Sequence, residues 1–220
     1  MGREVTTILG LTNKLTDEFA WRRKELKVLK DKIPSTGGSL QAAMLRSSVP
    51  LLYAHWEGFV KVAMSCYLEH VSRKYVPNNV LTPKFLALSL QNKLGDFIET
   101  SFESKAKIIE LLFVDYSKKS NIPKKNIINT KSNLRFDVLK EILFLLDLED
   151  SHIDGHKELI NDLVDTRNHI AHGEYNSVDF KTYASIHDDV IALMEYLKTK
   201  IENNAVQKKY ILAAPLITSP

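Results

Sequence analysis

The sequence predicts an all-α fold, a helical bundle of about five or six main helices. Apolar residues recur every three or four positions along almost the whole chain, which is the spacing of helices with one buried face. No convincing run of alternating polar and apolar residues indicates a β-strand, and we find no internal repeat. At 220 residues the chain is long enough for one substantial domain.

The first two expected helices are long. The first covers residues 5–33 and ends at PSTGGS, where a proline and two glycines interrupt the periodicity. Its apolar stripe is broken only by Arg22. The second covers about residues 39–75, and a kink or a restart is expected at Pro50 because proline lacks a backbone N–H.

Shorter helices are expected in the middle of the chain. TPKFLALSLQNKL predicts a helix with Thr82 as its N-cap and Pro83 at its first position. Another is expected over residues 103–118. The following SNIPKKNIINTKSN is expected to be a polar and basic connection.

Three helices are expected in the last third. SNLRFDVLKEILFLLDL has one broad apolar face, and SHIDGHKELINDLVDTRNHIAHGEY forms the next helix. Gly173 suits the left-handed position that closes that helix. The last helix covers about residues 177–203.

The chain is expected to form a single helical domain over residues 1–203. Within it, residues 1–36 form the N-terminal helix and residues 39–203 form the core. Residues 204–220 form a tail that is apolar yet contains two prolines. The pattern leaves three options open for the tail, namely docking on the body, pairing as a strand or contacting another chain.

Composition limits the class of protein. No apolar run approaches the roughly 20 residues of a membrane-spanning helix, so no membrane partner is expected. The single cysteine, Cys66, excludes an internal disulfide framework and favours a reducing, cytoplasmic compartment. The N-terminus lacks the features of a secretory signal.

Positive charge is small in total but locally concentrated. The net charge is +3, while WRRKELKVLKDK and SKKSNIPKKN are basic clusters that attract phosphates. The alternative interpretation is a solvated helix face for the first and a mobile loop for the second. The candidate RNA contacts are Arg22, Arg23, Lys118, Lys119, Lys124 and Lys125.

LVDTRNHIAHGEY concentrates nitrogen bases near the end of one helix. Asp165, Asn168 and His172 share a helix face, whereas Arg167 and His172 are five residues apart and therefore about 140° apart around the axis. A single narrow pocket would not receive both from a regular helix. Three explanations are open. The helix end is distorted, or the site is a wide groove, or a second copy of the chain supplies the opposite wall of the site.

These residue types suit phosphate chemistry. Histidine accepts and donates protons near neutral pH, and arginine binds phosphate oxygens with a fixed fork of donors. Because the 2′-hydroxyl of RNA is an internal nucleophile, histidine and arginine suffice without a metal. The simpler interpretation is a polar helix face that carries histidines.

Three stretches resemble a known family. RNHIAH matches the signature of the HEPN superfamily (higher eukaryotes and prokaryotes nucleotide-binding domains), in which a histidine follows an arginine after a short gap. Asparagine directly after the arginine is its commonest form. With LYAHWEGFVK and SNLRFDVLKEIL, the motif resembles the HEPN group named after the MAE_28990 and MAE_18760 proteins. The three stretches occur in the expected order over most of residues 40–200.

The resemblance implies a homodimer that pairs through its motif helices, with two copies of the motif facing a shared cleft. It implies a metal-independent endoribonuclease with no cofactor, in which His172 transfers protons, Arg167 stabilises the phosphate and Asn168 is a positioning residue. The products would be a 2′,3′-cyclic phosphate and a 5′-hydroxyl. Implied partners are RNA, a second copy, and an antitoxin or another component of a toxin–antitoxin, abortive-infection or restriction-linked defence system.

Two carboxylates are candidates for supporting the motif. Glu57 is interpreted either as a buried, hydrogen-bonded residue beside the packed Trp56 or as a group that orients Arg167 or His172. Asp165 is the second candidate, because it shares the motif face.

Two other functions remain open. The first is a non-catalytic HEPN module that binds a nucleotide or RNA or acts as a scaffold; such domains commonly lose the arginine or the histidine, and this chain keeps both. The second is a metal-dependent hydrolase using His152, His156, His169 or His172. The spacing of His152 and His156 suits zinc, yet HIDGH lacks a metalloprotease glutamate and no cysteine ligand is nearby.

Overall fold

The computed structural model describes residues 5–94 and 101–213, which form eight α-helices and two short 3-10 helices. The α-helices are α1 (Ile8–Lys32), α2 (Gly38–Ser72), α3 (Pro83–Leu94), α4 (Phe102–Asp115), α5 (Phe136–Leu145), α6 (Ser151–Asp154), α7 (Lys157–Ala171) and α8 (Phe180–Val206), and the 3-10 helices are η1 (Ile33–Ser35) and η2 (Asn78–Val80). The described residues contain no β-strand and only two isolated β-bridges. The predicted all-α class is therefore confirmed.

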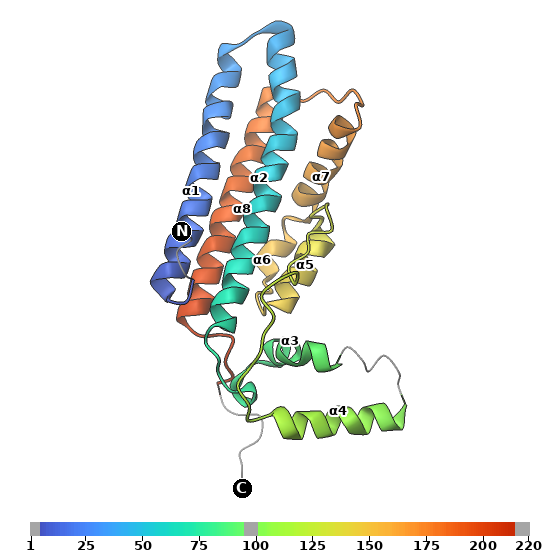
Figure 1. Cartoon of the computed structure of the whole chain (residues 1–220). Coiled ribbons are helices and arrows are strands. Elements are labelled where there is room, and N and C mark those ends of the chain that lie inside the picture. Colours follow the sequence, from blue (N-terminus) through green and yellow to red (C-terminus); the bar gives the residue numbers. More distant parts are fainter. Residues whose placement is uncertain (1–4, 95–100, 214–220) are drawn as a thin grey trace.

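Three long helices form the body of the molecule. Figure 1 shows α1, α2 and α8 side by side, with α7 beside them and α5 and α6 below α7. The most extensive packing joins α1, α2 and α8 to one another, and α7 packs on α2. In Figure 1, α3 and α4 lie across the foot of this bundle.

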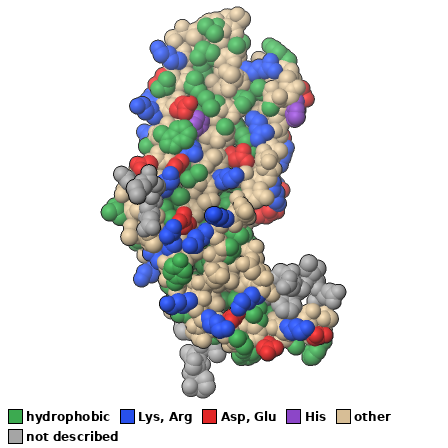
Figure 2. Space-filling model, in the orientation of Figure 1, with side chains coloured by type: hydrophobic (Ala, Val, Ile, Leu, Met, Phe, Trp, Pro, Cys, Tyr) green, Lys and Arg blue, Asp and Glu red, His purple; other side chains and the backbone are tan. Residues whose placement is uncertain are grey.

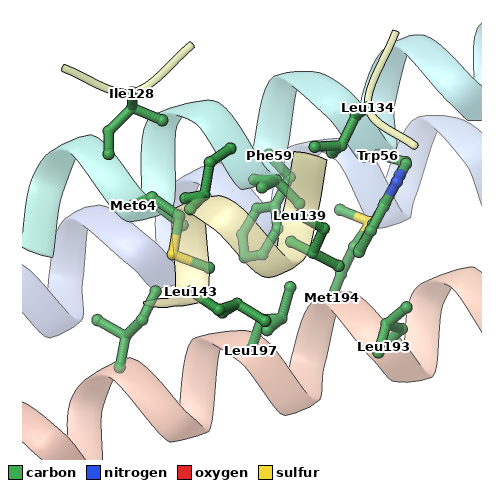
Figure 3. Close-up of a cluster of buried hydrophobic side chains, with 14 of the residues drawn as sticks. Trp56, Phe59, Met64, Ile128, Leu134, Leu139, Leu143, Leu193, Met194 and Leu197 are labelled. Atoms are coloured by element: carbon green, nitrogen blue, oxygen red, sulfur yellow. The ribbon is translucent and has the colours of Figure 1, made fainter. Parts of the chain in front are cut away.

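The core lies where these helices meet. Figure 3 shows apolar side chains from α2, α5, α8 and the connection before α5 packed against one another. The labelled residues are Trp56, Phe59, Met64, Ile128, Leu134, Leu139, Leu143, Leu193, Met194 and Leu197. All are buried, so the apolar periodicity of the sequence corresponds to one shared core.

The structure excludes one of the two alternatives expected at Pro50 and changes one helix boundary. Helix α2 continues through Pro50 without a restart. The missing N–H removes only one helical hydrogen bond, and burial of Val49 and Leu52 on either side supports the helical course. The expected single helix after residue 150 is divided into α6 and α7 at Gly155, where glycine has low helix propensity.

The first part of the C-terminal tail docks on the body. Tyr210 is buried, its carbonyl accepts a 3.0 Å hydrogen bond from the Thr82 N–H, and the Leu212 N–H donates to the Val80 carbonyl at 2.9 Å. This contact agrees with two of the three options for the tail, because it docks and pairs through a single β-bridge. The rest of the tail, residues 214–220, lies outside the described residues.

Cys66 is buried, and burial raises the pKa of its thiol to about 11. The thiol is therefore protonated and unreactive at neutral pH. Among residues 5–94 and 101–213, no helix combines the length and the apolar character needed to cross a membrane.

Candidate functional site

The nitrogen-rich motif lies at the C-terminal end of α7. Arg167 and Asn168 belong to the last turns of this helix, and His172 is its C-cap. Gly173 has φ +82°, and its N–H and that of the next residue donate to carbonyls of the last turn at 3.1 and 2.9 Å. This is a Schellman ending, which requires a left-handed residue. The role predicted for Gly173 is confirmed.

The Arg167 guanidinium is held between three segments. Its Cζ atom lies 4.1 Å from the centre of the Tyr53 ring on α2. One terminal nitrogen donates to the Ser132 carbonyl at 3.0 Å, and the other donates to Asn168 Oδ1 at 2.7 Å. Glu57 Oε2 lies 4.0 Å from Nη2. The guanidinium therefore has one preferred orientation, while 21% of the Arg167 side chain remains exposed.

Helix α2 supplies the wall behind Arg167. Tyr53 and Glu57 are one turn apart and therefore on the same face. Burial raises the pKa of Tyr53, and the adjacent Glu57 carboxylate raises it further, so the phenol is neutral near pH 7 and presents its ring to Arg167. The structure thus places Glu57 beside Arg167, one of the two interpretations weighed from the sequence.

The turn before α5 completes this wall. Lys131 and Ser132 have φ +53° and +60°, so two consecutive non-glycine residues adopt left-handed conformations. The next turn is fixed because the buried Leu134 N–H donates to the Tyr53 hydroxyl at 2.7 Å. These constraints direct the Ser132 carbonyl towards Arg167.

Asp165 has a partner that the helix periodicity does not indicate. Its carboxylate forms a two-point ion pair with the Arg135 guanidinium, with Nη1 donating to Oδ2 at 3.4 Å and Nη2 donating to Oδ1. Hydrogen bonding to Arg135 lowers the pKa of Asp165. The carboxylate therefore contacts Arg135, the N-cap residue of α5, and support of the motif by Asp165 stays a prediction.

The histidines of the motif are both exposed. The His169 ring contacts the Glu174 carboxylate through Nδ1. Among the described residues, no hydrogen bond or ion pair involves the His172 ring, which lies in solvent. The segment after His172 is tied back to α2, because Arg46 donates to the Glu174 carbonyl at 2.8 Å. The chain therefore presents an exposed histidine at a helix end whose backbone is held in place.

One candidate RNA contact is not on the surface. Arg22 is buried between α1 and α2, and its Nη1 atom donates to the Glu18 carbonyl at 2.7 Å and to Glu18 Oε2 at 2.5 Å. An added Cβ at Gly58 of α2 would lie 3.5 Å from the guanidinium. The expectation for Arg22 is corrected: this arginine is a packed, paired residue.

The other basic candidates are exposed but lie away from the motif. These residues are Arg23, Lys118, Lys119, Lys124 and Lys125. Lys118 is paired with Asp115 at 2.7 Å, and Lys119 forms a β-bridge with Pro77 beyond the end of α2. The distance along α2 from Tyr53 to its C-terminus is about 30 Å. In Figure 2, Lys and Arg side chains alternate with Asp and Glu side chains on the visible face.

The two histidines with zinc spacing pack against each other and against an aromatic ring. The rings of His152 and His156 are 5.0 Å apart, and the His152 ring lies 4.2 Å from that of Tyr196. Within the part of the chain that the structure describes, no group of three or more histidine, cysteine or acidic side chains could hold a metal ion.

Four contributors to the site were not singled out from the sequence: Tyr53, Ser132, Arg135 and Arg46. For Tyr53 a signal exists, because it lies one helical turn before Glu57 in LYAHWEGFVK. The other three act through contacts at least 30 residues away along the chain. The local pattern contains no sign of such contacts.

Comparison with known families places this arrangement in a class. A family model, RiboL-PSP-HEPN, matches residues 17–203. The all-α bundle is therefore a HEPN domain, as the resemblance predicts. Because the match covers most of its length, the chain belongs to the RiboL-PSP-HEPN family. No curated protein and no solved structure matches the chain.

Proposed function

We propose that this chain is a metal-independent endoribonuclease that acts as a homodimer. HEPN domains are often ribonucleases, which gives the coarse class. In the proposal, the ends of two α7 helices meet, and Arg167, Asn168 and His172 of both copies line a shared cleft. The shared cleft removes the geometric problem of residues that point about 140° apart on one helix.

The reaction follows from the chemistry of the three side chains. The RNA 2′-hydroxyl loses its proton to a histidine and attacks the adjacent phosphorus, forming the 2′-O–P bond. The P–O5′ bond breaks, and the leaving 5′-oxygen receives a proton from the second histidine of the dimer. Arg167 stabilises the charge on the equatorial phosphate oxygens. The products are a 2′,3′-cyclic phosphate and a 5′-hydroxyl.

The observation that carries the proposal is the contrast between the two ends of the motif. Arg167 is fixed by Tyr53, Ser132 and Asn168, whereas the His172 ring is exposed and makes no polar contact within the described residues. A charge that stabilises a transition state benefits from a fixed position. A proton-transfer group requires direct access to substrate.

The finer assignments belong to this proposal. They comprise membership of the HEPN group named after the MAE_28990 and MAE_18760 proteins, a cytoplasmic location and a domain over residues 1–203. They also include a role with an antitoxin or another partner in toxin–antitoxin, abortive-infection or restriction-linked defence. RNA is the proposed substrate, with Arg23 and the exposed lysines as secondary electrostatic contacts.

The test is cleavage of a structured RNA in EDTA buffer, followed by analysis of the product ends. We expect the wild-type protein to leave cyclic phosphate ends. His172→Ala should lower the rate by at least about 100-fold. His169→Ala is the matched control, because His169 is also exposed at this helix end but is not assigned to proton transfer. It should retain cleavage.

A second candidate function is a non-catalytic RNA- or nucleotide-binding module. It is favoured by the two hydrogen bonds that Arg167 already donates within the chain, which leave three of its five N–H groups for a phosphate. RNA binding without cleavage by a folded, dimeric wild-type protein would favour this module. Equal cleavage by wild type and His172→Ala would contradict the proposed enzyme.

A further inference from the structure

Helix α4 exposes an apolar stripe to solvent. It lies at the foot of the bundle, below α3 in Figure 1, with its half-buried residues Ile108 and Leu111 on the side away from the stripe. Phe102, Ile109 and Phe113 are 87%, 54% and 76% exposed. A helix with apolar residues on opposite sides normally has both sides covered. The described chain covers only one.

The stripe has the spacing of a helix-pairing surface. Phe102, Ala106, Ile109 and Phe113 follow one another at intervals of four, three and four residues. These intervals correspond to alternating d and a positions of a heptad, which form the seam between two paired helices. Ala106 is also exposed, so the four residues form a continuous stripe on the outer side of α4.

The charged residues beside the stripe define an orientation. Lys105 and Glu110 flank it on opposite sides, at the g and e positions of the same heptad. Both are exposed, and neither forms an ion pair among the described residues. In contrast, Glu103 and Lys107, farther around the helix, are paired with each other at 2.5 Å.

We propose that this stripe binds α4 of a second copy of the chain in parallel orientation. In a parallel pair, a g residue lies beside the e residue five positions later on the other helix. Lys105 then faces Glu110 of the second copy, and the symmetric pair forms once more. In an antiparallel pair, the lysine side of one helix would face the lysine side of the other, and the two glutamate sides would also face each other. Charge complementarity therefore selects the parallel arrangement.

The size of the contact predicts its strength. The 14 residues of α4 extend about 21 Å, so the two helices alone bury less surface than a standard protein interface. The contact is therefore weak by itself. It is distinct from the proposed pairing of motif helices and would join such dimers into larger assemblies.

Disulfide trapping of the full chain tests the proposal. Ile109→Cys puts a thiol at a d position, where the two copies face each other across the axis of a parallel pair. Lys107→Cys is the matched control, because this exposed position points away from the stripe. Native Cys66 is buried and does not interfere. Under mild oxidation, Ile109→Cys should form covalent dimers at least about tenfold faster than Lys107→Cys.

Charge reversal in the Ile109→Cys background tests the orientation. Lys105→Glu or Glu110→Lys alone replaces two attractive pairs by two repulsive ones and should slow trapping about tenfold. The double variant restores opposite charges and should restore the rate. The side chains are exposed, so circular dichroism should show an unchanged fold for each variant.

Three results would overturn the proposal. They are equal trapping of Ile109→Cys and Lys107→Cys, trapping that does not respond to the single reversals, and a double variant as slow as the singles. Equal trapping would assign the stripe to another occupant, such as a different protein, and either of the other two results would contradict the parallel orientation set by Lys105 and Glu110. None depends on ribonuclease activity, so the outcome is separate from the test of His172.

Discussion

The two ends of the motif lie in opposite environments, although they are only five residues apart. The Arg167 end lies against α2 and the turn before α5, where an aromatic ring and two hydrogen-bond acceptors fix the guanidinium. The His172 end lies beyond the last helical turn, and its ring is in solvent. One helix therefore carries a cation held by its neighbours and, five residues later, an exposed imidazole.

This difference indicates which neighbouring groups the position of Arg167 depends on and which the position of His172 depends on. Arg167 depends on side chains from elsewhere in the chain, so its function is sensitive to changes on α2. His172 depends on the backbone ending that Gly173 allows, so its function is sensitive to the geometry of that turn. The following predictions separate these two dependencies.

The largest effect is expected from Arg167→Lys. Lysine keeps the charge but loses the planar fork and the stacking on Tyr53. We expect cleavage of RNA to fall about 100-fold, measured as a single-turnover rate. Arg23→Lys is the control, because Arg23 is exposed on α1 and lysine keeps the charge on which its proposed electrostatic contact with RNA depends. An unchanged rate for Arg167→Lys would mean that charge alone suffices at this end.

A smaller effect on stability is expected from Tyr53→Phe. The variant keeps the ring below Arg167 but leaves the buried Leu134 N–H without its acceptor. The free energy of unfolding should fall by about 1–3 kcal/mol in urea titrations. Tyr175→Phe, at a residue that is 86% exposed, should change it by less than about 0.5 kcal/mol. If the folded variant also fails to cleave RNA, the Tyr53 hydroxyl contributes to activity in addition to holding the Leu134 N–H.

Gly173→Ala tests the His172 end. Because φ is +82°, alanine is strained there even though a Cβ would meet open space. We expect a loss of about 1 kcal/mol in thermal or urea unfolding. Gly155→Ala is the matched control, since Gly155 has an ordinary right-handed φ of −67° and an added Cβ there would make only a van der Waals contact at 3.6 Å. Equal effects of the two changes would show that the left-handed turn is not the cause.

The smallest effect is expected from Asp165→Asn. The Arg135 pair is largely exposed, so its loss should cost no more than about 0.5 kcal/mol at pH 7. Hydrogen bonding to Arg135 lowers the pKa of Asp165 in the folded state. The ion pair therefore stabilises the folded protein at pH values above the pKa that Asp165 has in the unfolded chain. This contribution is lost as the pH falls through the pKa of Asp165 in the folded protein. The difference between variant and wild type in urea should therefore vanish in acid. A loss of several kcal/mol would assign Asp165 a larger role.

Local sequence predicted the features that depend on local physics. The stripe of α1, the Pro83 start of α3 and the Gly173 ending of α7 each follow from spacing or from one residue's backbone preference. For α2, sequence left a kink or a restart open at Pro50, because a local rule for proline does not include the packing of the residues around it, and the helix continues without a restart. Tertiary burial outweighed the missing hydrogen bond.

The parts of the candidate site that the sequence pattern did not predict depend on contacts between residues far apart in the chain. Tyr53 and Leu134 are 81 residues apart, and Arg167 and Ser132 are 35 apart. Asp165 shares a helix face with the motif, yet a partner 30 residues away binds it. Spacing places a side chain on a helix face, but the fold decides which neighbour it meets.

Helix α2 also sets a length in the site. Arg46 binds the backbone just beyond His172, and Tyr53 lies under Arg167, so α2 contacts both ends of the motif. These two residues are seven positions apart, which is two helical turns or about 10 Å. The helix therefore fixes both the spacing and the relative direction of the two contacts. Inserting one residue between them would rotate one contact by about 100° around the helix axis relative to the other.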